Sequence, residues 1–175
     1  MMVMHKDQRV AVFVDVQNMY YSAKNIYGAK VNFGSVLKKA VGKRSLIRAI
    51  AYTIKADVKD EKTFYEALEK IGFEVKAKEL QTFHTGAKKG DWDMGIAIDM
   101  IKLAPKLDAA ILVSGDGDFR VLLEHVRAMG CRAEVMAFGK TTNQKLKEEA
   151  DYFIDMDKYN RRYLIPMRHK NGRKQ

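Results

Sequence analysis

The residues best able to support chemistry in this sequence are four aspartates: Asp15, Asp93, Asp116 and Asp118. Four carboxylates in one crevice repel one another, and they stay ionised only if a cation or several hydrogen-bond donors compensate them. All the ligands are oxygens and the sequence has no His or Cys cluster, so the expected cation is a hard one, Mg²⁺ or Mn²⁺. Such an ion activates water and offsets charge on a leaving oxygen, which is the chemistry of phosphodiester cleavage.

Two apolar runs must bring these acids together. Asp15 comes directly after the run at residues 10–14, and Asp116 comes shortly after the run at residues 109–113. Runs of this kind are typical of strands buried on both faces of a parallel sheet. Each acid alone has a structural explanation, as a helix cap or a first-turn residue favoured by the helix dipole. The metal hypothesis depends on Asp15 and Asp116 ending two central strands.

The remaining pattern alternates strands and helices. Strands are predicted at residues 10–14, 46–54, 73–80, 109–113 and 132–138, with a short last one at 152–154. Helices are predicted at residues 18–27, 33–40, 61–71, 118–129 and 142–149, with one more running from an Asp91 cap to residue 103. This predicts a three-layer α/β/α fold around a mostly parallel sheet of order 3-2-1-4-5. The winding reverses between the first and fourth strands, where ligands bind in such sheets.

The charge is strongly positive, with 32 Lys and Arg, 22 Asp and Glu, and a net charge of +10. From residue 158 onward there are basic residues and no acidic ones: Lys158, Arg161, Arg162, Arg168, Lys170, Arg173 and Lys174. We interpret residues 1–157 as one domain and residues 158–175 as a basic tail. A tail of this kind suits a polyanion, most often nucleic acid, although it could also be a solubilising or disordered end.

Composition excludes several classes of protein. A single cysteine excludes a disulfide framework, and no apolar run is long enough for a membrane span. The start MMVMHKDQRV does not look like a secretory signal, so a cytoplasmic protein is expected. The sequence does not fix the oligomeric state, and a two-fold homodimer is the commonest arrangement.

Four segments, in order, carry a family resemblance: FVDVQN at residues 13–18, KKGDWDMGIAID at 88–99, SGDGDF at 114–119 and EADYFID at 149–155. Together they resemble the NYN domain family, in its LabA-like branch, within the PIN-like nuclease superfamily. The resemblance implies a PIN-like fold and a metal-dependent endoribonuclease that acts on RNA. It also implies that Asp15, Asp93, Asp116 and Asp118 are the acidic positions that bind metal and catalyse. The segment at residues 88–93 has one more residue between glycine and aspartate than the commonest version of this family motif. The departure weakens the assignment of a role to Lys89 more than the assignment of Asp93.

Five further residues are candidates for substrate binding: Asn18, Lys88, Lys89, Ser114 and Thr141. Under this hypothesis Asp15 and Asp116 bind one ion, while Asp93 and Asp118 bind a second ion or hold its waters. Water then attacks phosphorus in line, which leaves a 5′-phosphate and a 3′-hydroxyl. Basic residues of the 81–90 loop and of the tail would hold the RNA backbone.

Two alternatives stay open at this point. One is a non-catalytic RNA-binding or regulatory module on the same fold. The other is a phosphatase of the haloacid dehalogenase type, but its nucleophile strand usually ends in D-x-D, and here Gln17 occupies the second acidic position.

Overall fold

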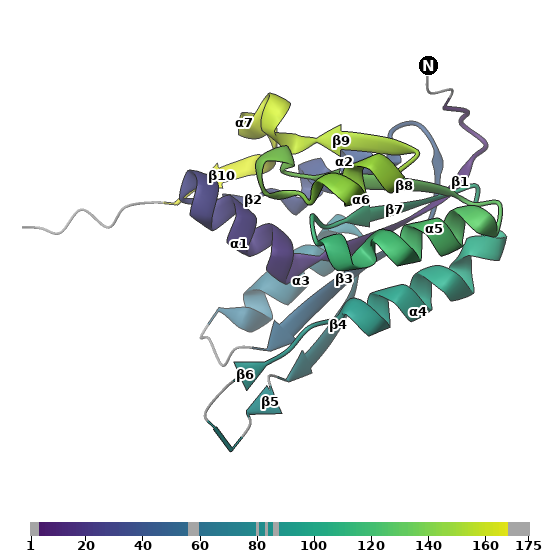
Figure 1. Ribbon diagram of the computed structural model, residues 1–175. Helices are drawn as coiled ribbons and strands as arrows, with labels where there is room; N and C mark the ends of the chain where they lie inside the picture. Colours follow the sequence, from purple (N-terminus) through teal and green to yellow (C-terminus); the bar gives the residue numbers. More distant parts are fainter. Residues whose placement is uncertain (1–3, 56–59, 80, 83, 86–87, 168–175) are drawn as a thin grey trace, which may run out of the picture.

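The computed structural model describes residues 4–55, 60–79, 81–82, 84–85 and 88–167. Its centre is a six-stranded sheet of order β4-β3-β1-β7-β8-β9 (Figure 1). All five pairings between neighbouring strands in this sheet are parallel. The strands are β1 (Arg9–Asp15), β3 (Ser45–Lys55), β4 (Glu74–Glu79), β7 (Ala109–Val113), β8 (Arg132–Ala137) and β9 (Tyr152–Asp155).

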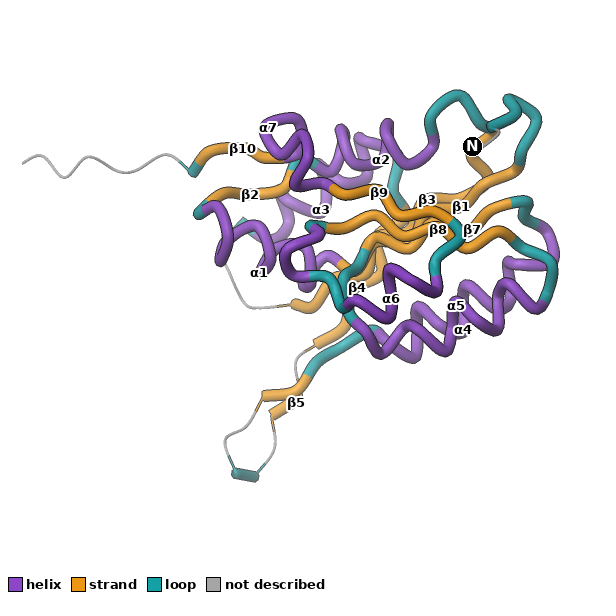
Figure 2. The backbone as a smooth tube through the Cα atoms, turned by 45° about the horizontal axis from the view of Figure 1, so that its top comes forward, coloured by secondary structure: helices purple, strands orange, loops and turns teal. Residues whose placement is uncertain are grey.

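Helices cover both faces of the sheet (Figure 2). They are α1 (Val16–Tyr27), α2 (Phe33–Val41), α3 (Glu61–Ile71), α4 (Asp93–Leu103), α5 (Arg120–Ala128), α6 (Gln144–Glu149) and α7 (Asn160–Tyr163). Short 3₁₀ helices lie at η1 (Ala104–Lys106), η2 (Gly117–Phe119), η3 (Gly139–Thr141) and η4 (Met156–Tyr159).

The central strands are apolar throughout because both of their faces are buried. Alternate residues of β1 point to opposite faces, so Val12 packs in one core and Phe13 in the other. The first core joins the sheet to α1 and α2, and the second joins it to α4 and α5. β1 and β7 lie side by side at the middle, and the alternating strand β4 lies at one edge, as the sequence predicts.

The strand order differs in detail from the expected 3-2-1-4-5. The five expected strands occur in that sequence, but β9 adds a sixth beyond β8. Within the described residues, two small antiparallel pairs lie outside this sheet. One joins β5 (Gln81–Thr82) to β6 (Lys88–Lys89), in a hairpin that extends away from the main sheet (Figure 1).

The segment expected to be a tail is folded in its first part. η4, α7 and β10 (Leu164–Pro166) follow β9 directly, and β10 pairs with β2 (Ala29–Val31). Tyr163 is buried at 1% exposure, and its carbonyl accepts a hydrogen bond from the Asn32 N–H at 2.8 Å. An apolar anchor and a strand pairing therefore hold residues 158–166 on the domain. Residues 168–175 lie outside the described part.

Two predicted helix starts are corrected. α6 begins at Gln144, and its cap is Asn143, whose side chain accepts from the Lys145 and Leu146 N–H groups, rather than a threonine. α4 begins at Asp93 with Trp92 in the N-cap position, although the Asp91 carboxylate still accepts from the Asp93 N–H at 3.3 Å.

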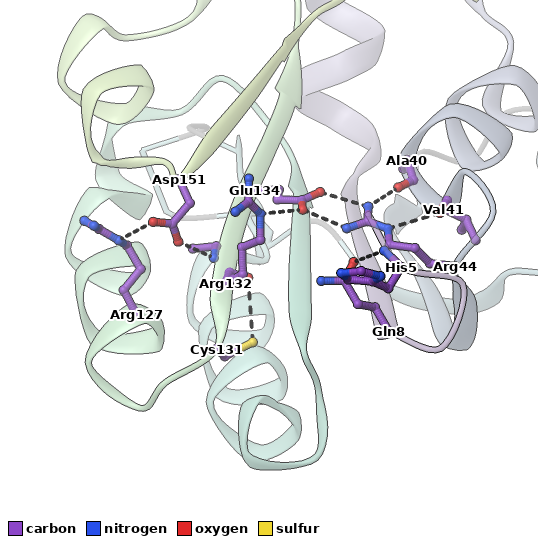
Figure 3. A network of polar contacts seen from close by, with 11 residues as sticks. His5, Gln8, Ala40, Val41, Arg44, Arg127, Cys131, Arg132, Glu134 and Asp151 are labelled. Atoms are coloured by element: carbon purple, nitrogen blue, oxygen red, sulfur yellow. Dashed lines mark hydrogen bonds and ion pairs between the residues drawn. The ribbon is translucent and has the colours of Figure 1, made fainter. Parts of the chain in front are cut away.

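A buried ion pair ties β8 to the segment after α2 (Figure 3). The Arg44 guanidinium donates to both carboxylate oxygens of Glu134, at 2.7 and 2.9 Å, and also to the Ala40 carbonyl. Both side chains are almost fully buried, so the Arg44 charge depends on Glu134 for compensation, while the Glu134 carboxylate also accepts from Arg132 at 3.0 Å.

Among the described residues, no helix has the length and apolar character needed to cross a membrane.

Candidate functional site

A pocket of about 560 Å³ opens at the carboxyl ends of the central strands. Its walls come from the β1–α1 junction, the end of β3, the start of α4 and the loop after β7. The lining residues are Asp15, Gln17, Asn18, Tyr21, Ser22, Asn25, Tyr52, Ile54, Asp91, Trp92, Asp93, Asp116 and Thr141. The pocket therefore lies at the predicted reversal of winding between β1 and β7.

Three carboxylates converge beside this pocket. Asp93, Asp116 and Asp118 each offer an oxygen, and these oxygens all lie within 4.8 Å of one another. The Asp116 carboxylate accepts from the Asp118 N–H at 3.0 Å, which fixes the turn that carries both acids. Asp99, on the same helix as Asp93, instead accepts hydrogen bonds from Tyr52 and Lys76.

Asp15 belongs to an adjoining hydrogen-bond network and not to the three-carboxylate cluster. Its carboxylate accepts from the Asn18 N–H and from the Ser114 hydroxyl, both at 3.2 Å. The Asn18 side-chain oxygen in turn accepts from the Gly115 N–H at 3.0 Å. These bonds join the ends of β1 and β7 across the crevice. The expected division of the four acids, with Asp15 and Asp116 on one ion and Asp93 and Asp118 on another, stays a prediction.

The electrostatics of the pocket favour a cation. Burial, and then repulsion from Asp116, Asp91, Asp15 and Asp118, raise the pKa of Asp93 to about 6. Burial also raises the pKa of Asp15 above its ordinary value, despite the hydrogen bonds from Asn18 and Ser114. Within the described part of the chain, none of the four predicted acids forms an ion pair with a Lys or Arg.

The donor set fits a hard divalent cation. Three carboxylates whose oxygens lie within 4.8 Å of one another offer oxygen ligands, and no described histidine or cysteine joins them. Mg²⁺ and Mn²⁺ are the ions that such ligands suit. An ion here would also relieve the repulsion that raises the pKa of Asp93.

The predicted substrate-binding residues have different places. Asn18 and Ser114 use their side chains to position Asp15 and the loop after β7. Thr141 lines the pocket, and its hydroxyl lies 3.2 Å from that of Ser22. Lys88 and Lys89 form β6, but their side chains lie outside the described part.

Trp92 fixes the helix that carries Asp93. Its indole N–H donates to the Thr53 carbonyl on β3 at 2.7 Å, and its ring lies 5.4 Å from that of Tyr52. A Cβ on Gly95 would come within 2.4 Å of this ring, so the glycine makes room for it. These contacts show that Trp92 packs the start of α4 against β3.

Gly115 and Gly117 make room for neighbouring backbone and side chains. A Cβ on Gly115 would lie 2.9 Å from the Thr142 hydroxyl, and one on Gly117 would lie 2.6 Å from the Asn143 side chain. The two glycines therefore allow the loop after β7 to pack closely against the segment after β8.

Sequence reasoning missed several pocket residues. Asp91 was interpreted only as a cap, yet it lines the pocket and contributes negative charge to Asp93. Tyr21 and Asn25 follow the predicted residue Asn18 at helical spacing on one face of α1, and this spacing was a usable signal. Tyr52 offered no comparable signal, because it is one of many apolar residues in its strand.

An α/β sheet with a cluster of aspartates at its carboxyl edge is the arrangement expected of a PIN-like nuclease fold. The model of the NYN domain matches residues 9–157, and the chain therefore belongs to the NYN domain family. This family is of the PIN-like nuclease type, and its members act on RNA.

Two similar proteins extend this result. The chain is 29% identical over 160 residues to the Low amplitude and bright protein LabA of Synechococcus elongatus, covering 87% of this chain and 86% of that protein. A crystal structure of a protein of unknown function from Vibrio parahaemolyticus is 33% identical, with a TM-score of 0.84. That match covers 94% of this chain and all of the other, so the fold is shared over nearly the full length.

Proposed function

We propose that this protein is a metal-dependent endoribonuclease. The observation that carries the proposal is the convergence of Asp93, Asp116 and Asp118 beside a pocket of an NYN domain. Members of the family act on RNA, and all four predicted acids lie in or beside this pocket.

Asp93, Asp116 and Asp118 would hold the divalent cation, Mg²⁺ or Mn²⁺. When bound, such an ion lowers the pKa of a water and offsets charge on the leaving oxygen. Asp15 borders the same space from the β1 side, where its carboxylate can orient a water or accept its proton. Ser114 and Asn18 hold Asp15 and the loop after β7 in place.

The residues around the four acids supply the proposed contacts to the RNA. Thr141 is an exposed hydroxyl residue on the pocket wall and is the proposed contact to an RNA phosphate. The hairpin that carries Lys88 and Lys89 follows the carboxyl end of β4, which runs parallel to β3, so it leaves the sheet at the edge where the strands carry the acids. This placement supports a role in holding the RNA backbone.

Cleavage of labelled single-stranded RNA in EDTA, Mg²⁺ and Mn²⁺ tests the proposal. The parent protein should cut only with metal, and Asp116→Asn should lower the rate by more than about a hundredfold, because it removes one of the charges that hold the ion. The matched control is Asp60→Asn, an exposed aspartate before α3 whose side chain makes no cap hydrogen bond. RNA binding in EDTA should persist in both variants.

Binding of RNA without cleavage in any metal would instead favour a non-catalytic RNA-binding module. Equal activity of the parent and Asp116→Asn would remove the cluster from the mechanism.

A further inference from the structure

A second pocket, away from the aspartates, lies in the segment just after β9. It has a volume of about 410 Å³ and is lined by five consecutive residues of η4 and α7: Lys158, Tyr159, Asn160, Arg161 and Arg162. Three of its five lining residues are cations, one is aromatic and one is an amide. None is acidic, so the pocket has the opposite charge to the aspartate pocket.

The aromatic residue is presented to solvent. Tyr159 is 69% exposed, which is unusual for a large ring on a folded element. The Arg162 guanidinium lies 5.6 Å from the centre of this ring, within the range of a cation–π contact. Among the described residues, Lys158, Arg161 and Arg162 form no ion pair with a carboxylate. An exposed ring with uncompensated cations beside it matches the two parts of a nucleotide, a base and a phosphate.

This segment is firmly attached to the domain. The Tyr27 hydroxyl donates to the Asp157 carboxylate and accepts from the Asn160 side-chain amide. Tyr163, whose side chain is buried, comes directly after Arg162, the last residue of the pocket. The pocket is therefore a preformed surface and not part of a loose tail.

The two pockets are joined along the carboxyl ends of β8 and β9. Thr141, at the end of η3, lines the aspartate pocket. The preceding residue, Lys140, donates its N–H to the Asp157 carboxylate at 2.8 Å. Asp157 is followed directly in the chain by Lys158, the first residue of the second pocket. The Lys140 ammonium lies 5.4 Å from the centre of the Tyr27 ring, so this connecting stretch also carries an exposed cation.

We propose that the Lys158–Arg162 pocket is a nucleotide subsite for the RNA strand that passes through the aspartate pocket. Tyr159 stacks on a base, and Arg161, Arg162 and Lys158 hold the neighbouring phosphates. This inference rests on the proposed function, since it takes an RNA strand at the aspartates as its starting point. It implies a substrate with a single-stranded segment several nucleotides long, because only unpaired bases can stack on an exposed ring.

Binding of fluorescent oligoribonucleotides in EDTA tests the subsite without requiring cleavage. With lengths from about two to about twelve nucleotides, the affinity of the parent should rise until the strand spans both pockets. Tyr159→Ala should weaken, by roughly tenfold, the binding of oligomers long enough to reach the subsite. Tyr20→Ala is the matched control, because Tyr20 is 41% exposed, has Lys24 above its ring at 5.7 Å and lies outside both pockets.

The double variant Arg161→Gln with Arg162→Gln tests the phosphate contacts separately. It should reduce the slope of log affinity against log salt by about 1.4, since each phosphate contact on a single strand contributes about 0.7. Lys102→Gln with Lys106→Gln removes two exposed cations around the end of α4, and should leave the slope unchanged.

An equal loss of affinity in Tyr20→Ala and Tyr159→Ala would overturn the subsite, as would affinity that does not depend on oligomer length. If Tyr159→Ala or the double arginine variant lost binding to anionic phosphatidylserine vesicles but kept its RNA affinity, the pocket would be assigned to a membrane surface. That result would also overturn the RNA subsite. A parent that binds RNA in the expected way but never cuts would contradict the proposed function and leave the subsite standing. A parent that cuts, with Tyr159→Ala unchanged in affinity and in cleavage of long RNA, would contradict the subsite alone.

Discussion

The protonation of Asp93 links the acidic pocket to the stability of the protein. The pKa of Asp93 is about 6 in the folded protein, against an ordinary value of 3.8, with burial as the largest cause and repulsion from neighbouring acids after it. Between these values the folded state binds a proton that the unfolded state has lost. The contribution of Asp93 to the free energy of unfolding therefore falls as the pH rises from about 4 to about 6.

We expect Asp93→Asn to stabilise the metal-free protein at neutral pH. In EDTA at pH 7 its Tm should exceed that of the parent, by roughly 2–4 °C for each kcal/mol of repulsion relieved. The difference should shrink towards zero below pH 4, where the parent is protonated in both states. Thermal melts across this pH range measure the effect, and a gain that is the same at pH 4 and pH 7 would contradict it. Added Mn²⁺ should stabilise the parent more than the variant.

At this scale the sequence predicts which acids approach the pocket but not how they group. Asp15 and Asp116 could be placed because parallel strands end at one edge of a sheet. That Asp15 is held by Ser114 and Asn18, while Asp118 joins Asp93 and Asp116, depends on local turns and side-chain rotamers. Asp91 is predicted only as a cap, because the predicted start of α4 lies one residue before the observed start.

At the scale of elements, the packing of Trp92 on α4 controls where Asp93 lies. Gly95→Ala should destabilise the protein by about 1–3 kcal/mol, because its Cβ would lie 2.4 Å from the Trp92 ring. It should also slow RNA cleavage by moving the start of α4. Chemical denaturation and the cleavage rate measure the two effects.

Gly34→Ala is the matched control. It is also a glycine in the first turn of a helix, α2, but its Cβ would meet the Asn32 side chain only at 3.4 Å. The usual preference for alanine in helices should make this variant neutral or more stable by up to about 1 kcal/mol. Similar destabilisation in both variants would show that the Trp92 contact is not the cause.

The long elements were predictable because each one's own hydrophobic pattern indicates its secondary structure and its burial. β1 and β7 are wholly apolar runs, and β4 alternates as an edge strand does. The short strands β2 and β10 were missed, since three residues carry little pattern and these strands form only through their mutual pairing. The same holds for the pair of β5 and β6 inside the predicted loop.

At the scale of the whole molecule, one buried charge pair connects distant parts of the chain. Glu134→Gln should destabilise the protein by about 3–5 kcal/mol, because it leaves the Arg44 guanidinium buried without its counter-charge. Glu149→Gln breaks the more exposed pair with Arg127 and should cost less than about 1 kcal/mol. Urea denaturation compares the two variants, and equal costs would contradict the burial argument.

The distribution of charge was only partly predictable at this scale. The excess of basic residues after residue 157 is plain in the sequence, and it was interpreted as a tail. In the structure its first part forms η4, α7 and β10, fixed by Tyr163 and by pairing with β2. A lone buried tyrosine in a basic segment gives a weak signal, because burial depends on the surface that receives it.

The ends of the RNA products test the central claim most directly. If carboxylates and a divalent cation direct water to the phosphorus, cleavage should require Mg²⁺ or Mn²⁺ and leave a 5′-phosphate and a 3′-hydroxyl. Mass spectrometry of the products from a labelled single-stranded RNA distinguishes these ends. Products with cyclic phosphates, formed equally well in EDTA or by Asp116→Asn, would mean that the 2′-hydroxyl is the nucleophile and would contradict the account.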